Sequence, residues 1–376
     1  MRAGRHDALL SALGSRRVLV VCGSGGVGKT TTAAALGLAA ARAGRRTLVC
    51  TIDPSRRLAT SLGLDALTER PRELDLGKVA PRSRGELHAM TLDTKRTFDA
   101  LVERYSPDPA SRDRILKNRF YREVSAALAG SHEYMAMEKL LELSGDPRFD
   151  LVILDTPPTR HALDFLEAPD RLLGFLDVGV LRYFLKPYFA AGRLTLRVAT
   201  RTGAAALRIA DRFLGLDFLQ DLSEFFLAFE SMYSGFKERA GRVHALVRDP
   251  SSGFVLVASP QAPTLDEALY FWKRLKEKQM PFIGFVVNRL RPLSGRSVAT
   301  KPCETLPADF AERLLGVFQE QQSMARLERR SVARLEVDAK EPLVLVPEFE
   351  GDVHDLRGLR DVADALVGPR DGRSAA

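Results

Sequence analysis

Short apolar runs alternate with longer amphipathic stretches along most of this 376-residue chain. The runs predict strands covered on both faces, because they are brief, continuous and rich in Val, Ile and Leu. In chain order they are Val18–Cys22, Thr47–Ile52, Leu87–Leu92, Leu151–Leu154, Phe254–Ala258, Ile283–Val287 and Leu343–Val346. Strands that alternate with helices predict an α/β fold: a doubly wound, mostly parallel sheet with helices on both faces.

Two stretches depart from this alternation, and we expect both to form a helical subdomain inserted on one side of the sheet. The first, 95–148, has helical patterns, and the second, 167–248, is a long run of apolar and aromatic residues at helical spacing. The division predicted for the rest is a sheet domain made of 1–94, 149–166 and 249–367, followed by a disordered tail, 368–376.

The aromatic residues of 167–248 fit two interpretations. They could line a groove for an apolar helix of a client protein, or they could form the core of the subdomain and a dimer interface. Met232 is the one methionine in this stretch, whereas adaptable client grooves are often rich in methionine. The composition therefore favours the core and dimer interface, and a dedicated partner stays open.

Composition indicates a soluble protein with a sizeable core, since 45% of the residues are hydrophobic. The net charge of +8 comes from Arg scattered along the chain, so it indicates nucleic acid or an anionic membrane only weakly. We expect neither a signal peptide nor a membrane span. Cys22, Cys50 and Cys303 lie too far apart for a disulfide framework or a zinc site, which fits a reducing cytoplasm.

The candidate chemistry centres on the run from Gly23 to Thr31, which reads GSGGVGKTT and fits G-x-x-x-x-G-K-[ST]. Its glycines allow backbone N–H groups to surround phosphate oxygens. Lys29 can reach the β- and γ-phosphates, and Thr30 can place a hydroxyl on Mg²⁺. The expected nucleotide-binding residues here are Gly23, Ser24, Gly25, Gly26, Val27, Gly28, Lys29, Thr30 and Thr31. A strand before the run and a helix pattern over Thr30–Arg42 disfavour a chance match.

Two aspartates follow strands that should end near this loop, because parallel strands meet their ligands at their carboxyl ends. Asp155 suits the Mg²⁺ ion, held directly or through water, and Asp53 suits the orientation of an attacking water. Each could instead cap the segment that follows it, although this is a weaker explanation for both together. Asn288 could pair with a purine edge, and the run from Pro347 to Gly351 could wrap the same base or belong to a turn without ligand.

These motifs resemble the ArsA type of ATPase, the arsenite-pump and tail-anchored-protein-targeting family within the MinD, ParA and nitrogenase-iron-protein class. The segments GSGGVGKTTTA, TIDPSRRL and VILDTPPTRHALDFL are similar to its phosphate loop and its two switches. The resemblance implies ATP and Mg²⁺ as cofactors, with Lys29 and Asp53 in catalysis, Thr30 and Asp155 at the metal, and Asn288 on adenine. It also implies dimerisation around ATP and a helical region that handles a client or partner protein.

Ser24 stands where the family has a lysine that crosses the dimer to the partner's phosphates. Arg56, Arg57 and Arg160 are candidates to replace its charge. Alternatively, the chain pairs with a homologue that retains the lysine, which would serve this chain's nucleotide in trans. The family's zinc-binding cysteine pair and arsenite-binding cysteines have no match, and this chain, similar to single-domain bacterial members, has one ATPase half.

Three functions therefore compete. The leading one is a cytoplasmic Mg²⁺-ATPase that forms a homodimer or heterodimer and handles a protein partner. The second is a regulatory or scaffold subunit that binds ATP but hydrolyses it poorly, which Ser24 motivates. The third, a positioning switch on membrane or DNA, is disfavoured because 352–367 has alternating charge and few aromatic residues.

Overall fold

The computed structural model describes the chain in several ranges, and most of the aromatic run lies outside them. The described residues are 4–53, 55–77, 79–81, 83–119, 121–122, 131–157, 167, 225, 232–294 and 307–368. The expectations for the greater part of 167–248, for Arg160, for Cys303 and for the tail after 368 therefore stay predictions.

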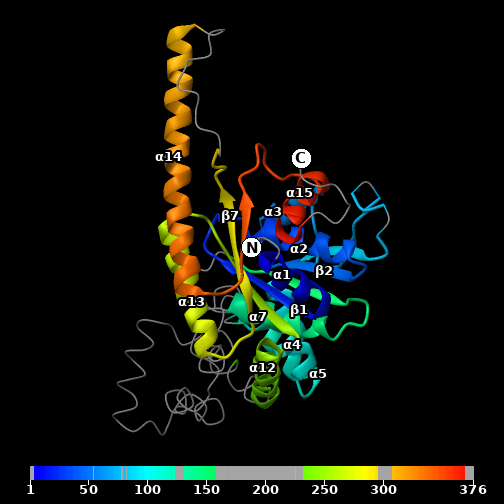
Figure 1. The fold of residues 1–376 in the computed structure, drawn as a ribbon. Helices are drawn as coiled ribbons and strands as arrows, with labels where there is room; N and C mark the ends of the chain where they lie inside the picture. Colours follow the sequence, from blue (N-terminus) through cyan, green and yellow to red (C-terminus); the bar gives the residue numbers. More distant parts are fainter. Residues whose placement is uncertain are drawn as a thin grey trace, which may run out of the picture. The chain divides into compact units, whose positions relative to one another are not determined.

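The described strands form one eight-stranded sheet in the order β3-β4-β2-β5-β1-β6-β7-β8. All neighbouring strands run parallel except β3, which is antiparallel to β4. The bounds are β1 Val18–Gly23, β2 Arg46–Thr51, β3 Arg72–Glu73, β4 Glu86–Thr91, β5 Leu151–Asp155, β6 Ser252–Ala258, β7 Phe282–Leu290 and β8 Leu343–Pro347. This arrangement confirms the predicted α/β fold with a mostly parallel sheet (Figure 1).

Helices connect most successive strands along the chain (Figure 1). Those described are α1 Gly4–Ser15, α2 Lys29–Arg42, α3 Arg57–Ser61, α4 Thr94–Tyr105, α5 Pro109–Lys117, α7 Ser131–Ser144, α12 Tyr233–Arg248, α13 Ala262–Glu277, α14 Ala308–Ala339 and α15 Leu356–Val367. None of the helices in the described ranges is both long enough and apolar enough to cross a membrane.

The chain divides into two compact units, and the sheet belongs to the first. Unit 1 comprises Met1–Leu92, Glu142–Leu163 and Leu246–Ala376, and unit 2 comprises Asp93–Leu141 and Asp164–Ala245. In unit 2, Phe98 packs on Tyr121 and Phe236 at ring-centre distances of 5.6 Å and 6.0 Å. These aromatic contacts give the described part of unit 2 a core of its own.

The core of unit 1 lies where α2 packs on the central strands. β1 is fully buried from Val18 to Cys22, as expected of a parallel strand covered on both faces. α2 is rich in alanine, and a Cβ added at Gly37 would lie 2.5 Å from a methyl carbon of Val49 on β2. Small residues thus let α2 approach the sheet closely and fix the loop that precedes it.

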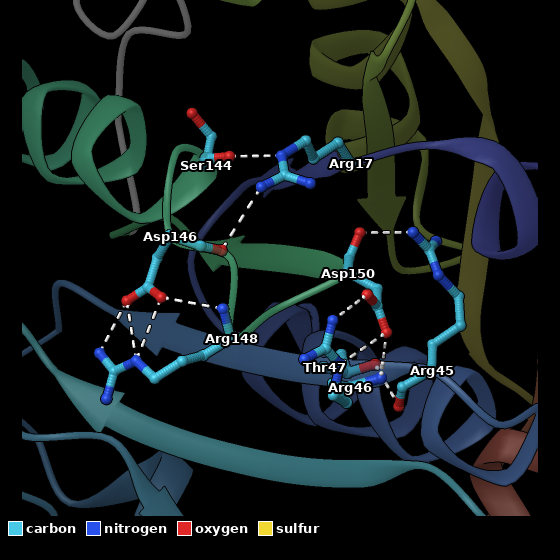
Figure 2. Close-up of polar contacts among 8 residues, drawn as sticks. All are labelled: Arg17, Arg45, Arg46, Thr47, Ser144, Asp146, Arg148 and Asp150. Carbon is cyan, nitrogen blue, oxygen red and sulfur yellow. Dashed lines mark hydrogen bonds and ion pairs between the residues drawn. The ribbon is translucent and has the colours of Figure 1, made fainter.

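A network of arginines holds the amino ends of the strands, opposite the edge that carries the phosphate loop (Figure 2). Arg17, just before β1, donates from its guanidinium to the backbone carbonyls of Ser144 and Asp146. Arg46 at the start of β2 makes a bidentate pair with Asp150, at 2.8 Å and 3.2 Å. The loop between α7 and β5 is therefore attached to both neighbouring strands before β5 leads to Asp155.

The sequence analysis did not anticipate α1, β3 or the 32-residue helix α14. α14 carries so many charged residues that its apolar positions form no compact run, although they recur at helical spacing. Its C-terminal half packs on α13 and β7 through Ala325, Val332 and Leu335. Tertiary contacts along this narrow apolar stripe stabilise the C-terminal half of α14, where the stripe is buried.

Candidate nucleotide site

The loop between β1 and α2 adopts a backbone that glycine favours. Gly23, Gly26 and Gly28 have φ angles of 152°, 77° and 93°, in the region that other residues rarely adopt. A Cβ at Gly23 would lie 2.1 Å from the carbonyl oxygen of Val257, so β6 also crowds this position. The loop leads directly into the first turn of α2, where free N–H groups favour an anion.

Lys29 begins α2 and turns back over the loop. Its Nζ donates to the carbonyl oxygen of Ser24 at 2.8 Å, and the residue is 6% exposed. Burial lowers the pKa of the ammonium group, and the nearby charge of Asp155 opposes this shift. A phosphate in the loop would supply the negative charge that this buried ammonium group lacks.

Ser24 is engaged on the outer side of the same loop. Its hydroxyl donates to a carboxylate oxygen of Glu267, which α13 brings to the loop from 243 positions further along the chain. The side chain at this position therefore presents neither a positive charge nor an unengaged hydroxyl.

Asp155 ends β5 directly below the first turn of α2. Its Oδ2 accepts hydrogen bonds from the hydroxyls of Thr30 and Thr51, both at 2.8 Å. The residue is fully buried, and its Oδ1 has no hydrogen-bond partner among the described residues. Burial raises the pKa of this carboxyl to about 6, while the two hydroxyls and Lys29 lower it.

This arrangement fits a divalent cation. Mg²⁺ prefers oxygen ligands, and it commonly keeps waters between itself and a protein carboxylate. The buried oxygen of Asp155 that lacks a partner, beside the hydroxyl of Thr30, provides the donors that such an ion requires. An uncompensated buried carboxylate is also costly, and a cation would offset that cost.

Asp53 follows β2 at the same edge of the sheet. Its Oδ1 accepts from the backbone N–H of Ser55 at 2.9 Å, and its Oδ2 lies 3.9 Å from the guanidinium of Arg57. The backbone N–H of Asp53 donates to the hydroxyl of Thr51 at 3.2 Å. The hydroxyl of Thr51 thus makes hydrogen bonds with both aspartates, with the side chain of Asp155 and the backbone N–H of Asp53.

Asn288 holds the loop from β7. Its Nδ2 donates to the carbonyl of Val27 at 3.0 Å, and its Oδ1 accepts from the backbone N–H of Arg289. A Cβ at Gly28 would lie 2.1 Å from that same Nδ2. Arg289 has a left-handed φ of 60°, and its guanidinium lies 3.5 Å from the carbonyl oxygen of Gly26. The predicted contact of Asn288 with a base stays a prediction.

A pocket of about 810 Å³ opens above these groups, large enough for a small-molecule ligand. Of the residues predicted from the sequence, it is lined by Gly26, Gly28, Lys29, Thr30, Thr31, Asp53, Asn288 and Pro347. Gly23, Ser24, Gly25, Val27 and Asp155 are not in its lining. Arg56 and Arg57 do line it, whereas Arg160 lies outside the described residues.

The sequence analysis missed four groups at this site. Thr51 lies two positions before Asp53, so a hydroxyl at a strand end was a usable signal. Glu267 and Arg289 reach the loop from distant elements, and their spacing in the chain gave no indication of it. Asp352 and Val353, just after the run that the sequence analysis named, also line the pocket.

The sequence model of one family, described as anion-transporting ATPase, matches residues 16–314. This match spans well over half of the chain and includes the loop, both aspartates and Asn288. The chain belongs to the anion-transporting ATPase family. Anion-transporting ATPases hydrolyse ATP, so this chain is an ATP hydrolase and the pocket is a candidate nucleotide site.

Three relatives of this ATPase align over nearly the whole chain. The ATPase ASNA1 homolog 1 of Paramecium tetraurelia is 21% identical, over 94% of this chain and 92% of that protein. The putative arsenical pump-driving ATPase 1 of Aquifex aeolicus is 23% identical, over 94% and 79%. The ATPase GET3C of Arabidopsis thaliana is 24% identical, over 96% and 85%.

Proposed function

We propose that this ATPase is Mg²⁺-dependent, dimerises around ATP and couples its nucleotide state to a protein client or partner through its helical unit. The observation that carries the proposal is that Lys29, Thr30 and the buried Asp155 lie together at the glycine-rich loop between β1 and α2. We also propose a cytoplasmic location, which is supported by Cys22 and Cys50, two buried cysteines that form no disulfide.

Each residue has a distinct role in this proposal. Lys29 leaves the carbonyl of Ser24 and pairs with the β- and γ-phosphates. Thr30 and Asp155 would hold Mg²⁺, partly through water, and the ion would supply positive charge beside the phosphates. Asp53 accepts a hydrogen bond from the attacking water and orients it. Gly23 to Thr31 cradle the phosphates, and Asn288 and Pro347 border the base.

The dimer and the protein partner rest on the family and on Ser24. A nucleotide held between two copies could receive charge from both, and Arg56 and Arg57 already line the pocket. The printed names of the relatives include a pump-driving ATPase and GET3 proteins. We therefore propose either a homodimer or a heterodimer with a homologue of the same family.

Direct ATP binding tests this proposal, with Lys29→Ala as the deciding variant. The substitution removes a charged donor from the phosphates, so affinity for Mg²⁺-ATP should fall about 10- to 100-fold. Lys273→Ala removes the same charge from an exposed position on α13 outside the pocket and should leave affinity unchanged. The proposal fails if the unaltered protein shows no micromolar ATP binding with Mg²⁺ present.

The second candidate is an ATP-binding regulatory or scaffold subunit that hydrolyses ATP poorly and pairs with a homologue bearing the loop lysine. The hydrogen bond from Ser24 to Glu267 favours it, because this loop position offers no charge to a partner's nucleotide. Turnover measured alone and with such a homologue separates the candidates. Brisk turnover by the isolated chain excludes the scaffold function.

A further inference from the structure

The N-terminal half of α14 carries an apolar seam that unit 1 leaves exposed. Its members are Phe310, Leu314, Val317 and Met324, exposed by 51%, 48%, 57% and 40%. Their spacing of four, three and seven residues is that of a coiled-coil seam, with Gln321 at the remaining position. Large apolar side chains at these positions would be buried if a second helix lay against them.

The seam lies at the same end of the sheet as the nucleotide pocket. Since β7 and β8 are parallel neighbours, the helix that joins them runs antiparallel to both and begins at their carboxyl ends. Its 32 residues span about 48 Å, whereas the nine residues of β7 span about 30 Å. The first turns of α14 therefore extend past the strand ends (Figure 1).

We propose that this half of α14 pairs antiparallel with the same segment of a second copy of the chain. In that register Leu314 lies opposite the partner's Val317, and Phe310 lies opposite the partner's Gln321. The charges beside the seam then match as well, because Arg313 faces the partner's Glu320 and the pair repeats by two-fold symmetry.

The charge pattern selects this orientation. In a parallel pair, heptad geometry would place Arg313 beside the partner's Phe318 and Glu320 beside the partner's Ala325, with no ion pair at either place. Arg313 is 81% exposed, and among the described residues it reaches one carboxylate, that of Asp309, at 4.0 Å. Its side chain is thus available to a second copy.

The pairing gives the proposed ATP-dependent dimer a defined geometry, and it rests on that part of the proposed function. A two-fold axis across α14 turns the carboxyl edges of the two sheets, and with them the two pockets, toward each other. A seam this short covers less than the roughly 1,600 Å² of a standard stable interface. The nucleotide edges must supply the rest, so ATP controls the association.

Oligomeric mass with and without Mg²⁺-ATP, measured by sedimentation, tests the pairing in the full chain. Arg313→Glu places like charges opposite each other twice and should weaken the ATP-bound dimer about tenfold or more. Arg313→Glu combined with Glu320→Arg restores both pairs and should recover the dimer. Val317→Asp, at a position that is 57% exposed, should abolish it without changing helix content.

The matched control is Arg329→Glu, the same charge change at an exposed position off the seam, which should leave the dimer unchanged. All variants should retain the ATP affinity of the monomer, measured at concentrations too low for dimers, since none lines the pocket. If the unaltered chain dimerises with ATP and Arg313→Glu and Val317→Asp dimerise equally well, the α14 pairing is wrong and the proposed dimer stands. If the unaltered chain stays monomeric with ATP, both the α14 pairing and the proposed homodimer are wrong.

Discussion

Asp155 links the pH of the solution to the metal site. Burial raises the pKa of its carboxyl to about 6, so the charged form that would hold Mg²⁺ is lost as pH falls through that value. Affinity for Mg²⁺-ATP should therefore decline between about pH 7 and pH 5. Isothermal titration across this range measures the decline in affinity, and Asp155→Asn should abolish that decline. An equal decline in the variant would show that protonation of the nucleotide, and not of Asp155, causes it.

The same pKa sets the sign of the stability change. A carboxyl whose folded pKa lies above its unfolded value disfavours the folded state as pH rises from about 3.8 to about 6, and the full cost persists above that. Without nucleotide, Asp155→Asn should thus melt at a higher temperature than the unaltered chain at pH 8. At pH 4 the difference should nearly vanish. Lower stability of the variant at pH 8 would contradict this assignment.

At the residue scale, contiguous patterns were predictable and distant contacts were not. Lys29 and Thr30 belong to one motif, and Asp155 directly follows an apolar run. The contact of Ser24 with Glu267 joins residues 243 positions apart, and no local pattern encodes that distance. The roles assigned to the predicted residues await the measurements proposed above.

At the scale of the element, the phosphate loop is shaped by its neighbour β7. Gly28→Ala would force a Cβ to within 2.1 Å of the amide of Asn288 at a left-handed backbone position. We expect at least a tenfold loss of ATP affinity, because the loop must shift. Gly26→Ala is the matched control, since its Cβ meets nothing within 4 Å and costs backbone strain alone, about 1–2 kcal/mol. Equal losses would exclude the crowding by Asn288.

The loop before β5 offers a second test at this scale. Arg17→Ala leaves the carbonyls of Ser144 and Asp146 without their guanidinium donor and should destabilise the fold by about 1.5–3 kcal/mol (Figure 2). Arg148→Ala removes an exposed pair with Asp146 in the same loop and should change little. Urea unfolding compares the two. If both substitutions lower the free energy of unfolding by a similar amount, Arg17 does not anchor this loop.

Buried elements could be predicted from the sequence, whereas elements that are exposed along much of their length could not. Seven of the strands are largely apolar runs, so the sequence predicted them with bounds that differ by at most three residues. β3 is two exposed residues, and charged residues interrupt the apolar positions along α14, so neither gives the pattern of a buried element. What stabilises α14 is tertiary contact along part of one face, which local sequence does not reveal.

At the scale of the whole molecule, the fold positions the candidate nucleotide site at one sheet edge and leaves an apolar seam beyond that edge. The family membership establishes ATP hydrolysis, and the alternation of strands and helices predicted the sheet. The partner could not be read from the sequence, because an interface depends on which surfaces remain open after folding.

The central claim is that this ATPase acts as a dimer around Mg²⁺-ATP. Its most direct test is the rate of Mg²⁺-dependent ATP hydrolysis per chain, measured over a wide range of protein concentration. The account predicts a rate that rises with concentration and reaches a plateau as dimers form. A rate per chain that stays constant on dilution to monomer, or the absence of hydrolysis at every concentration, would contradict it.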